Sequence, residues 1–143
     1  MKKLLFLLAI PMALSITSCK KAGCTDPEAE NYSSGAKKED HSCTYKGEIV
    51  FWNDQTISQD MINAGITSLT YYVDGQIVGS SVSSIYWTSA PSCGQNGSIT
   101  VTKDLGSAKN KSYTYSIVDQ DGFELWAGVA NFTANTCTKI QLN

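Results

Sequence analysis

Residues 68–80 read Ser-Leu-Thr-Tyr-Tyr-Val-Asp-Gly-Gln-Ile-Val-Gly-Ser, which is the clearest structural pattern in the chain. Leu69, Tyr71 and Val73 stand at alternate positions, which predicts a strand with these side chains buried and Tyr72 on the polar face. The Asp-Gly pair that follows is typical of a two-residue type I′ turn, in which both central residues need a positive φ. We therefore expect an antiparallel hairpin here.

Short runs of β-branched and aromatic residues, separated by turn residues, continue on both sides of the hairpin through residues 47–143. Predicted strands lie at 48–52, 68–73, 76–80, 82–88, 98–102, 112–118, 123–132 and 138–142. Only residues 58–64 look helical, with Ser58 as the N-terminal cap and Gly65 as the stop signal. So many short strands in one domain-sized segment predict an all-β fold, an immunoglobulin-like antiparallel β-sandwich.

The N-terminus has the pattern of an export signal. A basic start precedes an apolar run from Leu4 to Leu14, which is shorter than the ~20 residues that span a bilayer. Ile16-Thr17-Ser18-Cys19 then resembles the lipobox of bacterial lipoproteins. The resemblance implies that residues 1–18 are a signal peptide and that Cys19 carries the lipid; the alternative is an ordinary cleaved signal, with Cys19 in a disulfide.

The residues after Cys19 bear on the choice of membrane. In proteobacterial lipoproteins an Asp at the next position looks like an inner-membrane retention signal, and Lys20 stands there in this chain. The resemblance therefore implies a lipid-anchored protein of the outer membrane. Lys20-Lys21-Ala22 also replaces the acidic run that resembles a surface-export signal, which favours the periplasmic face over the cell surface.

Four cysteines remain in a chain that leaves the cytoplasm, so disulfides are expected, and four cysteines allow three pairings. We favour Cys24 with Cys43 and Cys93 with Cys137, because each pair lies within one compositionally distinct segment. The competing hypothesis is a zinc–thiolate site. Such sites usually contain CxxC-like pairs, and this chain has none.

Residues 23–43 begin Gly-Cys-Thr-Asp-Pro-Glu-Ala-Glu-Asn-Tyr and end Asp-His-Ser-Cys. They resemble a cysteine-bounded module, G-C-T-D-P-x-A-x-N-Y-x-x-x-A-x-x-x-D-G-S-C, of secreted and surface proteins of Bacteroidetes. The chain departs from this pattern at His41, where the module has Gly, a residue that tolerates positive φ better than His does. We expect residues 19–46 to form the lipidated cysteine and a disulfide-closed linker module.

The linker module also contains oxygen donors that the disulfide would draw together: Asp26, Asn31, Glu39 and Asp40. Calcium takes six to eight oxygen ligands, so this set predicts a weak calcium site. The spacing is not that of an EF-hand loop, and solvated acidic side chains are the alternative interpretation. We expect no other cofactor.

The domain at 47–143 resembles a small, uncharacterised β-domain of Bacteroidetes lipoproteins. The residues that carry this resemblance are Val50-Phe51-Trp52, Val73-Asp74-Gly75-Gln76 with Gly79, Ala90-Pro91-Ser92-Cys93-Gly94, Tyr113-Thr114-Tyr115 and Leu125-Trp126-Ala127-Gly128 with Asn135-Thr136-Cys137. They are patterns of strands and turns rather than a catalytic signature. The resemblance therefore implies a binding or scaffold unit.

Composition argues against two classes of function. All 11 basic residues are lysine, and residues 47–143 carry four lysines against eight acidic residues, so a nucleic-acid partner is disfavoured. The single histidine, His41, lies outside the predicted sandwich, which leaves a serine or cysteine nucleophile there without a histidine base. We therefore do not expect an enzyme.

These observations predict a non-catalytic envelope lipoprotein whose sandwich serves as a structural or protein-interaction module. The alternative is a carbohydrate-binding lipoprotein that stacks exposed aromatic residues on neutral sugars, as aromatic-rich β-sandwiches do. Tyr72, Trp52 and Trp87 are the candidate residues for that role. Aromatic residues also dominate the cores of small domains, so burial is the competing expectation for each tryptophan.

Overall fold

The structure, a computed structural model, describes residues 20–143. Cys19 and the predicted signal peptide lie outside the described residues. The elements are β1 (Tyr45–Trp52), α1 (Gln55–Asn63), β2 (Ser68–Val73), β3 (Gln76–Val82), β4 (Ile99–Gly106), β5 (Asn110–Asp119), β6 (Glu124–Thr133) and β7 (Cys137–Gln141). Within the described part of the chain, no helix is long and apolar enough to cross a membrane.

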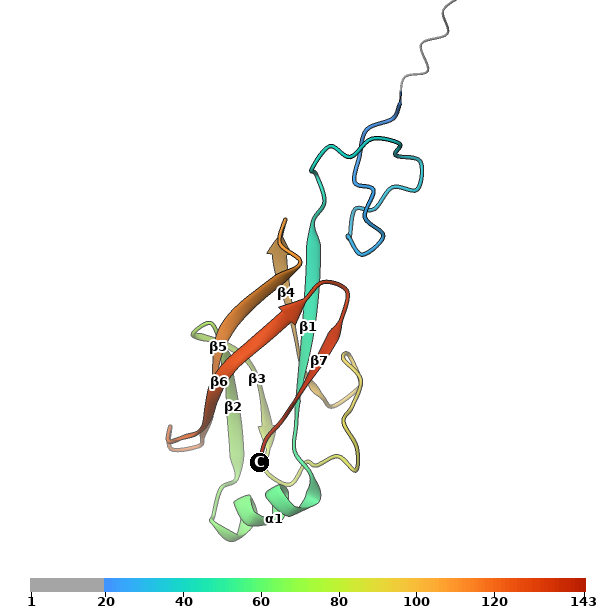
Figure 1. The fold of residues 1–143 in the computed structure, drawn as a ribbon. Coiled ribbons are helices and arrows are strands. Elements are labelled where there is room, and N and C mark those ends of the chain that lie inside the picture. Colours follow the sequence, from blue (N-terminus) through green and yellow to red (C-terminus); the bar gives the residue numbers. More distant parts are fainter. Residues whose placement is uncertain (1–19) are drawn as a thin grey trace, which may run out of the picture.

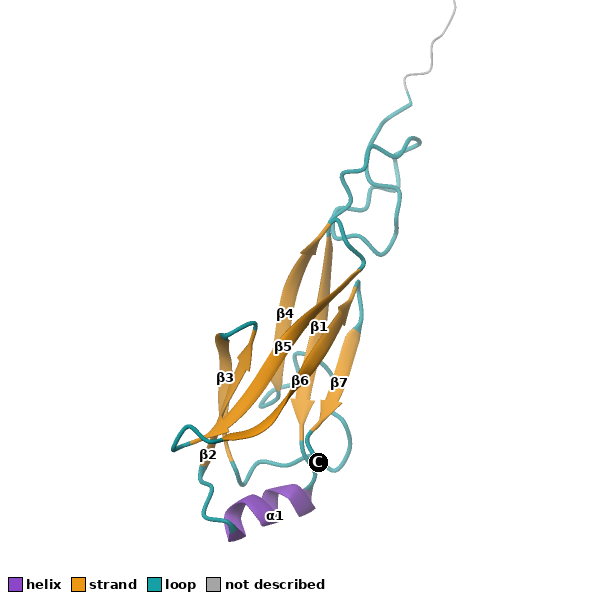
Figure 2. Cartoon of the chain, turned by 60° about the vertical axis from the view of Figure 1, so that its left-hand side comes forward, coloured by secondary structure: helices purple, strands orange, loops and turns teal. Residues whose placement is uncertain are grey.

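The strands form two sheets, one of order β4-β1-β7 and one of order β3-β2-β5-β6. Neighbouring strands are antiparallel except β1 and β7, which pair in parallel. Figure 1 shows the two sheets side by side, and Figure 2 shows α1 at the end opposite to residues 20–44. The predicted all-β, sandwich-like fold is confirmed, with β1 beginning two residues before the expected domain boundary at 47.

The central hairpin forms as predicted. Asp74 and Gly75 have φ values of 57° and 70°, which is the left-handed pair that a type I′ turn requires. Leu69, Tyr71 and Val73 are buried, while Tyr72 lies on the opposite face and is half-buried.

The predicted strand at 82–88 is wrong. Val82 ends β3, and residues 83–98 form a loop. The backbone carbonyls of this segment accept hydrogen bonds from side chains rather than from a neighbouring strand: Ser58 Oγ donates to Ser83 O (2.8 Å) and Asn53 Nδ2 to Ile85 O (3.2 Å). Because these donors come from far along the chain, local alternation does not reveal them.

The helix also begins earlier than predicted. Its N-terminal cap is Asp54, whose carboxylate accepts a hydrogen bond from Ile57 N (3.0 Å). Ser58, the predicted cap, lies inside α1. Its side chain is buried and donates a hydrogen bond to the loop. The stop signal is correct, since Gly65 follows the helix with a φ of 78°.

The core lies between the sheets and contains aromatic rings packed among aliphatic side chains. The ring of Phe51 on β1 lies 5.6 Å from that of Tyr71 and 5.2 Å from that of Tyr115, between ring centroids. On β6, Phe132 meets Tyr113 edge-on at 5.5 Å. Gly128 admits the Tyr115 ring, because a Cβ at this position would lie 2.9 Å from that ring.

Candidate functional site

The outer face of the β4-β1-β7 sheet is covered. Val50 points away from Ile49 and Phe51, which are in the core, and pairs with residues of β4 and β7, yet it is fully buried. The covering element is the loop at 83–98, which is joined to β7 by a disulfide between Cys93 and Cys137. This sheet therefore has little free surface at its centre.

The outer face of the β3-β2-β5-β6 sheet is open. Since Leu69, Tyr71 and Val73 point inward, the alternate residues of β2 and those paired with them on the neighbouring strands point outward. We call this surface the open face. It consists of Ser68, Thr70, Tyr72, Ile77, Ser80, Val82, Ser112, Thr114, Ser116, Val118, Glu124, Ala127, Val129 and Asn131.

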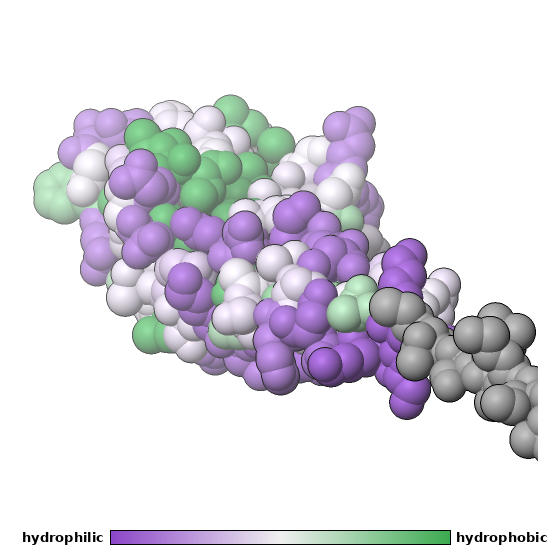
Figure 3. Space-filling view, turned by 90° about the horizontal axis from the view of Figure 1, so that it is seen from above, coloured by the Kyte–Doolittle hydropathy of each residue, from purple (hydrophilic) through white to green (hydrophobic). Residues whose placement is uncertain are grey.

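Two properties set the open face apart. Glu124 is the one charged residue in the set, although solvated sheet faces usually carry many charges. Three aliphatic side chains are more than half exposed on it: Ile77 (67%), Val82 (51%) and Val129 (60%). Figure 3 shows hydrophobic surface gathered away from the grey trace and hydrophilic surface beside it.

A shallow cavity of about 330 Å³ lies on the open face, with Tyr72, Thr114, Ser116 and Ala127 in its lining. Tyr72 thus lies on an outward surface, as the sequence predicts. Trp52 ends β1 in the other sheet and Trp87 lies in the covering loop, and both are half-buried. The three predicted ligand-binding aromatics do not share one surface.

A second hollow, of about 260 Å³, lies between α1 and β6. Ile57, Met61, Ile66, Leu125 and Trp126 supply its apolar lining, with Asp60 at its edge. The Trp126 indole N–H donates a hydrogen bond to the carbonyl oxygen of Asn143 (3.0 Å), so this indole has a structural role.

Both predicted disulfides are present with the favoured pairing, Cys24–Cys43 and Cys93–Cys137. Cys24, Glu39 and Cys43 lie close enough to be considered as metal ligands within residues 20–143. Because both sulfurs are bonded to each other, neither can act as a thiolate ligand in this state.

The four residues predicted to bind calcium all hold the backbone of their own module. Asn31 Oδ1 accepts from Thr44 N (3.0 Å) and Asp40 Oδ1 from Ser42 N (3.0 Å). Asp26 and Glu39 line the same cavity of about 400 Å³, and each already accepts several hydrogen bonds.

Glu39 stabilises the module by accepting hydrogen bonds from residues on both sides of it. Its Oε2 accepts hydrogen bonds from the Thr25 hydroxyl (2.7 Å) and Thr25 N (2.8 Å), and its Oε1 accepts one from His41 N (2.8 Å). These donors, the Thr25 hydroxyl first, lower the pKa of Glu39. His41 has a φ of 63°, the left-handed conformation expected where the module pattern has Gly.

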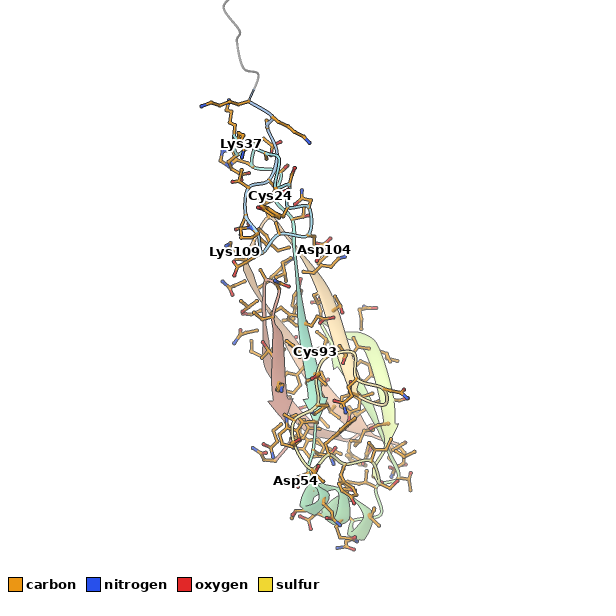
Figure 4. The ribbon with its side chains drawn as sticks, turned by 90° about the vertical axis from the view of Figure 1, so that its right-hand side faces the viewer. Cys24, Lys37, Asp54, Cys93, Asp104 and Lys109 are labelled. Atoms are coloured by element: carbon orange, nitrogen blue, oxygen red, sulfur yellow. A yellow bond between two sulfur atoms is a disulfide. The ribbon has the colours of Figure 1, made fainter. Side chains whose placement is uncertain are left out.

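Lys109, in the turn between β4 and β5, binds the module to the sandwich. Its ammonium lies 2.6 Å from Asp26 Oδ2 and 2.6 Å from Glu28 Oε2, and 5.6 Å from the centre of the Tyr45 ring. The Tyr45 hydroxyl donates to the same Asp26 oxygen (2.8 Å). Figure 4 shows Lys109 at the junction between the module and the strands. The segment predicted as a linker is thus packed against the domain.

The contacts at this junction shift the pKa values of Asp26 and Lys109. Lys109, then the Glu28 backbone N–H and the Tyr45 hydroxyl, lower the pKa of Asp26 from 3.8 to about 2. The two carboxylates raise the pKa of Lys109 above its ordinary value, with Asp26 the larger cause. Sequence reasoning missed Lys109 because its partners lie some 80 residues earlier in the chain.

The junction predicts acid sensitivity. Between pH 4 and pH 2 the unfolded chain binds a proton at Asp26 and the folded chain does not, so stability falls as the pH drops through this window. Asp26→Asn should therefore flatten the dependence of the unfolding midpoint on pH there, leaving the part due to Glu39, whose pKa is lowered too. Denaturant titrations at several pH values measure this; equal slopes for both proteins would contradict the assignment.

Comparison of the chain with known protein families, with curated proteins and with solved structures gives no match.

Proposed function

We propose that this chain is a non-catalytic, lipid-anchored envelope protein that binds a protein partner through the open face. The observation that carries the proposal is the contrast between the two sheets: a disulfide-fastened loop covers one outer face, and the other is left open. The open face combines exposed Ile77, Val82 and Val129 with a single charge.

A protein surface fits this chemistry best. The centres of protein interfaces are depleted in charged residues, and exposed apolar patches on soluble domains commonly mark interaction sites. The hydroxyl groups of Ser112, Thr114 and Ser116 add donors and acceptors that a partner can use or that water can bridge. Ile77 and Val82 lie on β3 and Val129 on β6, so apolar contacts would frame a polar centre.

A neutral glycan is the second candidate. Tyr72 on the wall of the 330 Å³ cavity supplies one aromatic ring, and neighbouring hydroxyl groups supply hydrogen bonds. Trp52 and Trp87 do not line this cavity, so of the three candidate residues only Tyr72 is placed to stack on a sugar there. A protein partner therefore remains our first choice.

The interaction is tested by placing charge on the open face. We expect Ile77→Lys with Val129→Lys to weaken partner binding at least tenfold, about 1.4 kcal/mol, because each lysine would be desolvated in an apolar contact. The measurement is the yield of a discrete adduct after chemical crosslinking of intact cells and purification of this chain.

Ile62→Lys is the matched control, since Ile62 is an exposed isoleucine on α1, away from the open face. An adduct that survives the double substitution, or is lost equally in the control, would contradict the assignment of the surface. Binding to a neutral polysaccharide that Tyr72→Ala abolishes, without any protein adduct, would support the glycan candidate instead.

We also propose that Cys19 carries the lipid and that the protein resides in the outer membrane, facing the periplasm. The support is the sequence Ile16-Thr17-Ser18-Cys19 and the lysines that follow it. Stable anchoring takes more than one acyl chain, which a triacylated cysteine supplies.

Metabolic labelling with palmitate tests the anchor. We expect the label on the wild type and its complete loss in Cys19→Ala, with the variant recovered outside the membrane fraction. Equal labelling of the two proteins would refute lipidation at Cys19.

A further inference from the structure

Four lysines meet at the end of the molecule from which the N-terminal segment leaves. Lys20 and Lys21 stand directly after Cys19, and Lys37 and Lys38 come from a later part of the module. The two segments pair side by side: Lys37 N donates to Lys21 O (2.8 Å), Gly23 N donates to Lys38 O (3.1 Å), and Ala22 forms a parallel bridge with Lys38. We call these four exposed residues the lysine tip.

The acidic residues of the module are held elsewhere. Asp26 and Glu28 pair with Lys109, and Glu30 pairs with Lys46 (2.9 Å), all toward the sandwich. Within residues 20–143, the lysines that form ion pairs are Lys46, Lys103 and Lys109, so none of the four lysines of the lysine tip is paired with a described carboxylate.

Glu39 and Asp40 are the acidic residues nearest to the lysine tip in sequence. Their carboxylates accept hydrogen bonds from backbone N–H groups of the module.

The opposite end of the molecule has the opposite charge. Asp54 and Asp60 lie at the α1 end, where residues 53–67 contain no lysine, and the turn after β5 adds Asp119 and Asp121. Figure 4 shows Lys37 beside the grey trace, Lys109 at the junction and Asp54 at the far end. The α1 end therefore carries acidic side chains without lysines, whereas the lysine tip carries lysines that form no ion pair with any described residue.

We infer that the lysine tip binds the anionic phospholipid headgroups of the membrane that holds Cys19, and so holds the sandwich upright on that membrane. The inference rests on the proposed lipid anchor. Lys20 is one residue from the attachment point, a Cα step of about 3.8 Å, and backbone pairing keeps Lys37 and Lys38 beside it. Charges interact over a Debye length of about 8 Å at physiological ionic strength, so lysines held this close to the anchor would be attracted to an anionic membrane surface.

The contacts between the module and the sandwich would fix the orientation of the sandwich on the membrane. Because Lys109 and Tyr45 hold the module against the strands, a membrane-bound lysine tip directs the acidic α1 end away from the anionic surface. The open face then runs alongside the long axis and is left accessible to a partner. Each lysine near an anionic surface strengthens binding roughly fivefold, so removing two weakens the contact roughly thirtyfold.

The test uses the lipidated protein purified from membranes and inserted into preformed vesicles. One set of vesicles is phosphatidylcholine alone, and the other contains phosphatidylglycerol as well. A membrane-impermeant amine reagent, followed by mass spectrometry, reports the labelling rate of each lysine. We expect Lys37 and Lys38 to be labelled at least fivefold more slowly on the anionic vesicles, and protection to disappear at high salt. Lys111 and Lys139, which are exposed and outside the lysine tip, should be labelled equally on both.

The matched variants are Lys37→Gln with Lys38→Gln, and Lys111→Gln with Lys139→Gln, which remove the same charge. The first pair should abolish protection of Lys20 and Lys21, and the second should leave it intact. Protein that sediments with both kinds of vesicle while all lysines react equally would overturn the lysine contact alone. Protein that sediments with neither would overturn the lipid anchor and, with it, this inference.

Discussion

Replacing Cys93 and Cys137 together by alanine is expected to lower the free energy of unfolding by about 4 kcal/mol. The disulfide closes a loop with a sequence separation of 44, and the chain-entropy relation for a loop of that length gives this value. Small domains are stable by only about 5–15 kcal/mol, so the loss is a large share of the total. It would also release the part of the loop around Cys93 from β7, while Ser83 and Ile85 keep their hydrogen bonds to α1 and Asn53.

Guanidinium denaturation of the two proteins measures this effect. Replacing Cys24 and Cys43 is the matched comparison, because that disulfide has a sequence separation of 19 and should contribute about 3 kcal/mol. A loss below 1 kcal/mol for the Cys93 and Cys137 variant would show that the loop is held to the sheet without its disulfide.

Phe132→Ala is expected to lower the free energy of unfolding by about 3–5 kcal/mol, because apolar burial is lost and a cavity is created. Phe132 is fully buried on β6 and meets Tyr113 across the core, so no neighbouring surface side chain can fill its space. Val129→Ala on the same strand is the control. Because Val129 is exposed on the open face, its truncation should change the free energy of unfolding by less than about 0.5 kcal/mol.

Thermal and denaturant unfolding of the two variants distinguish the inner and outer faces of β6. Equal losses for Phe132→Ala and Val129→Ala would contradict the assignment of faces on which the open face depends. A small loss for Phe132→Ala alone would mean that the space between the sheets collapses around the smaller side chain.

The parts of the fold that local chemistry determines could be predicted from the sequence. The Asp74-Gly75 turn needs two residues with positive φ, and its flanking alternation sets the buried face, so the hairpin and the outward position of Tyr72 follow. The disulfide pairing also follows, because each pair of cysteines lies within one segment.

The parts that depend on distant partners could not be predicted. The segment at 82–88 has the composition of a strand, but Ser58 and Asn53 supply hydrogen bonds that hold it as a loop. Similarly, Lys109 carries no local sign that it binds Asp26 and Glu28, which lie some 80 residues away.

The open face could not be predicted from the sequence either, because it also depends on segments that are distant in the chain. The hydroxyl residues of β5 that alternate with aromatic residues are Ser112, Thr114 and Ser116. This alternation predicts one polar side of the strand, but it does not show whether another element covers that side. That depends on the loop at 83–98, which packs on the other sheet and leaves this one free. The exposure of Ile77 and Val129 at either edge follows from topology rather than from their own strands.

Site-specific photocrosslinking in intact cells would show whether a protein partner contacts the open face. A photoreactive residue at Thr114 lies on the open face, opposite Val129 of β6, and one at Asn96 lies on the exposed covering loop of the other sheet. We predict a discrete protein adduct from position 114 that Ile77→Lys with Val129→Lys removes, and no such adduct from position 96. An adduct from position 96 alone, or none from position 114 in protein shown to be in the membrane, would contradict binding through the open face.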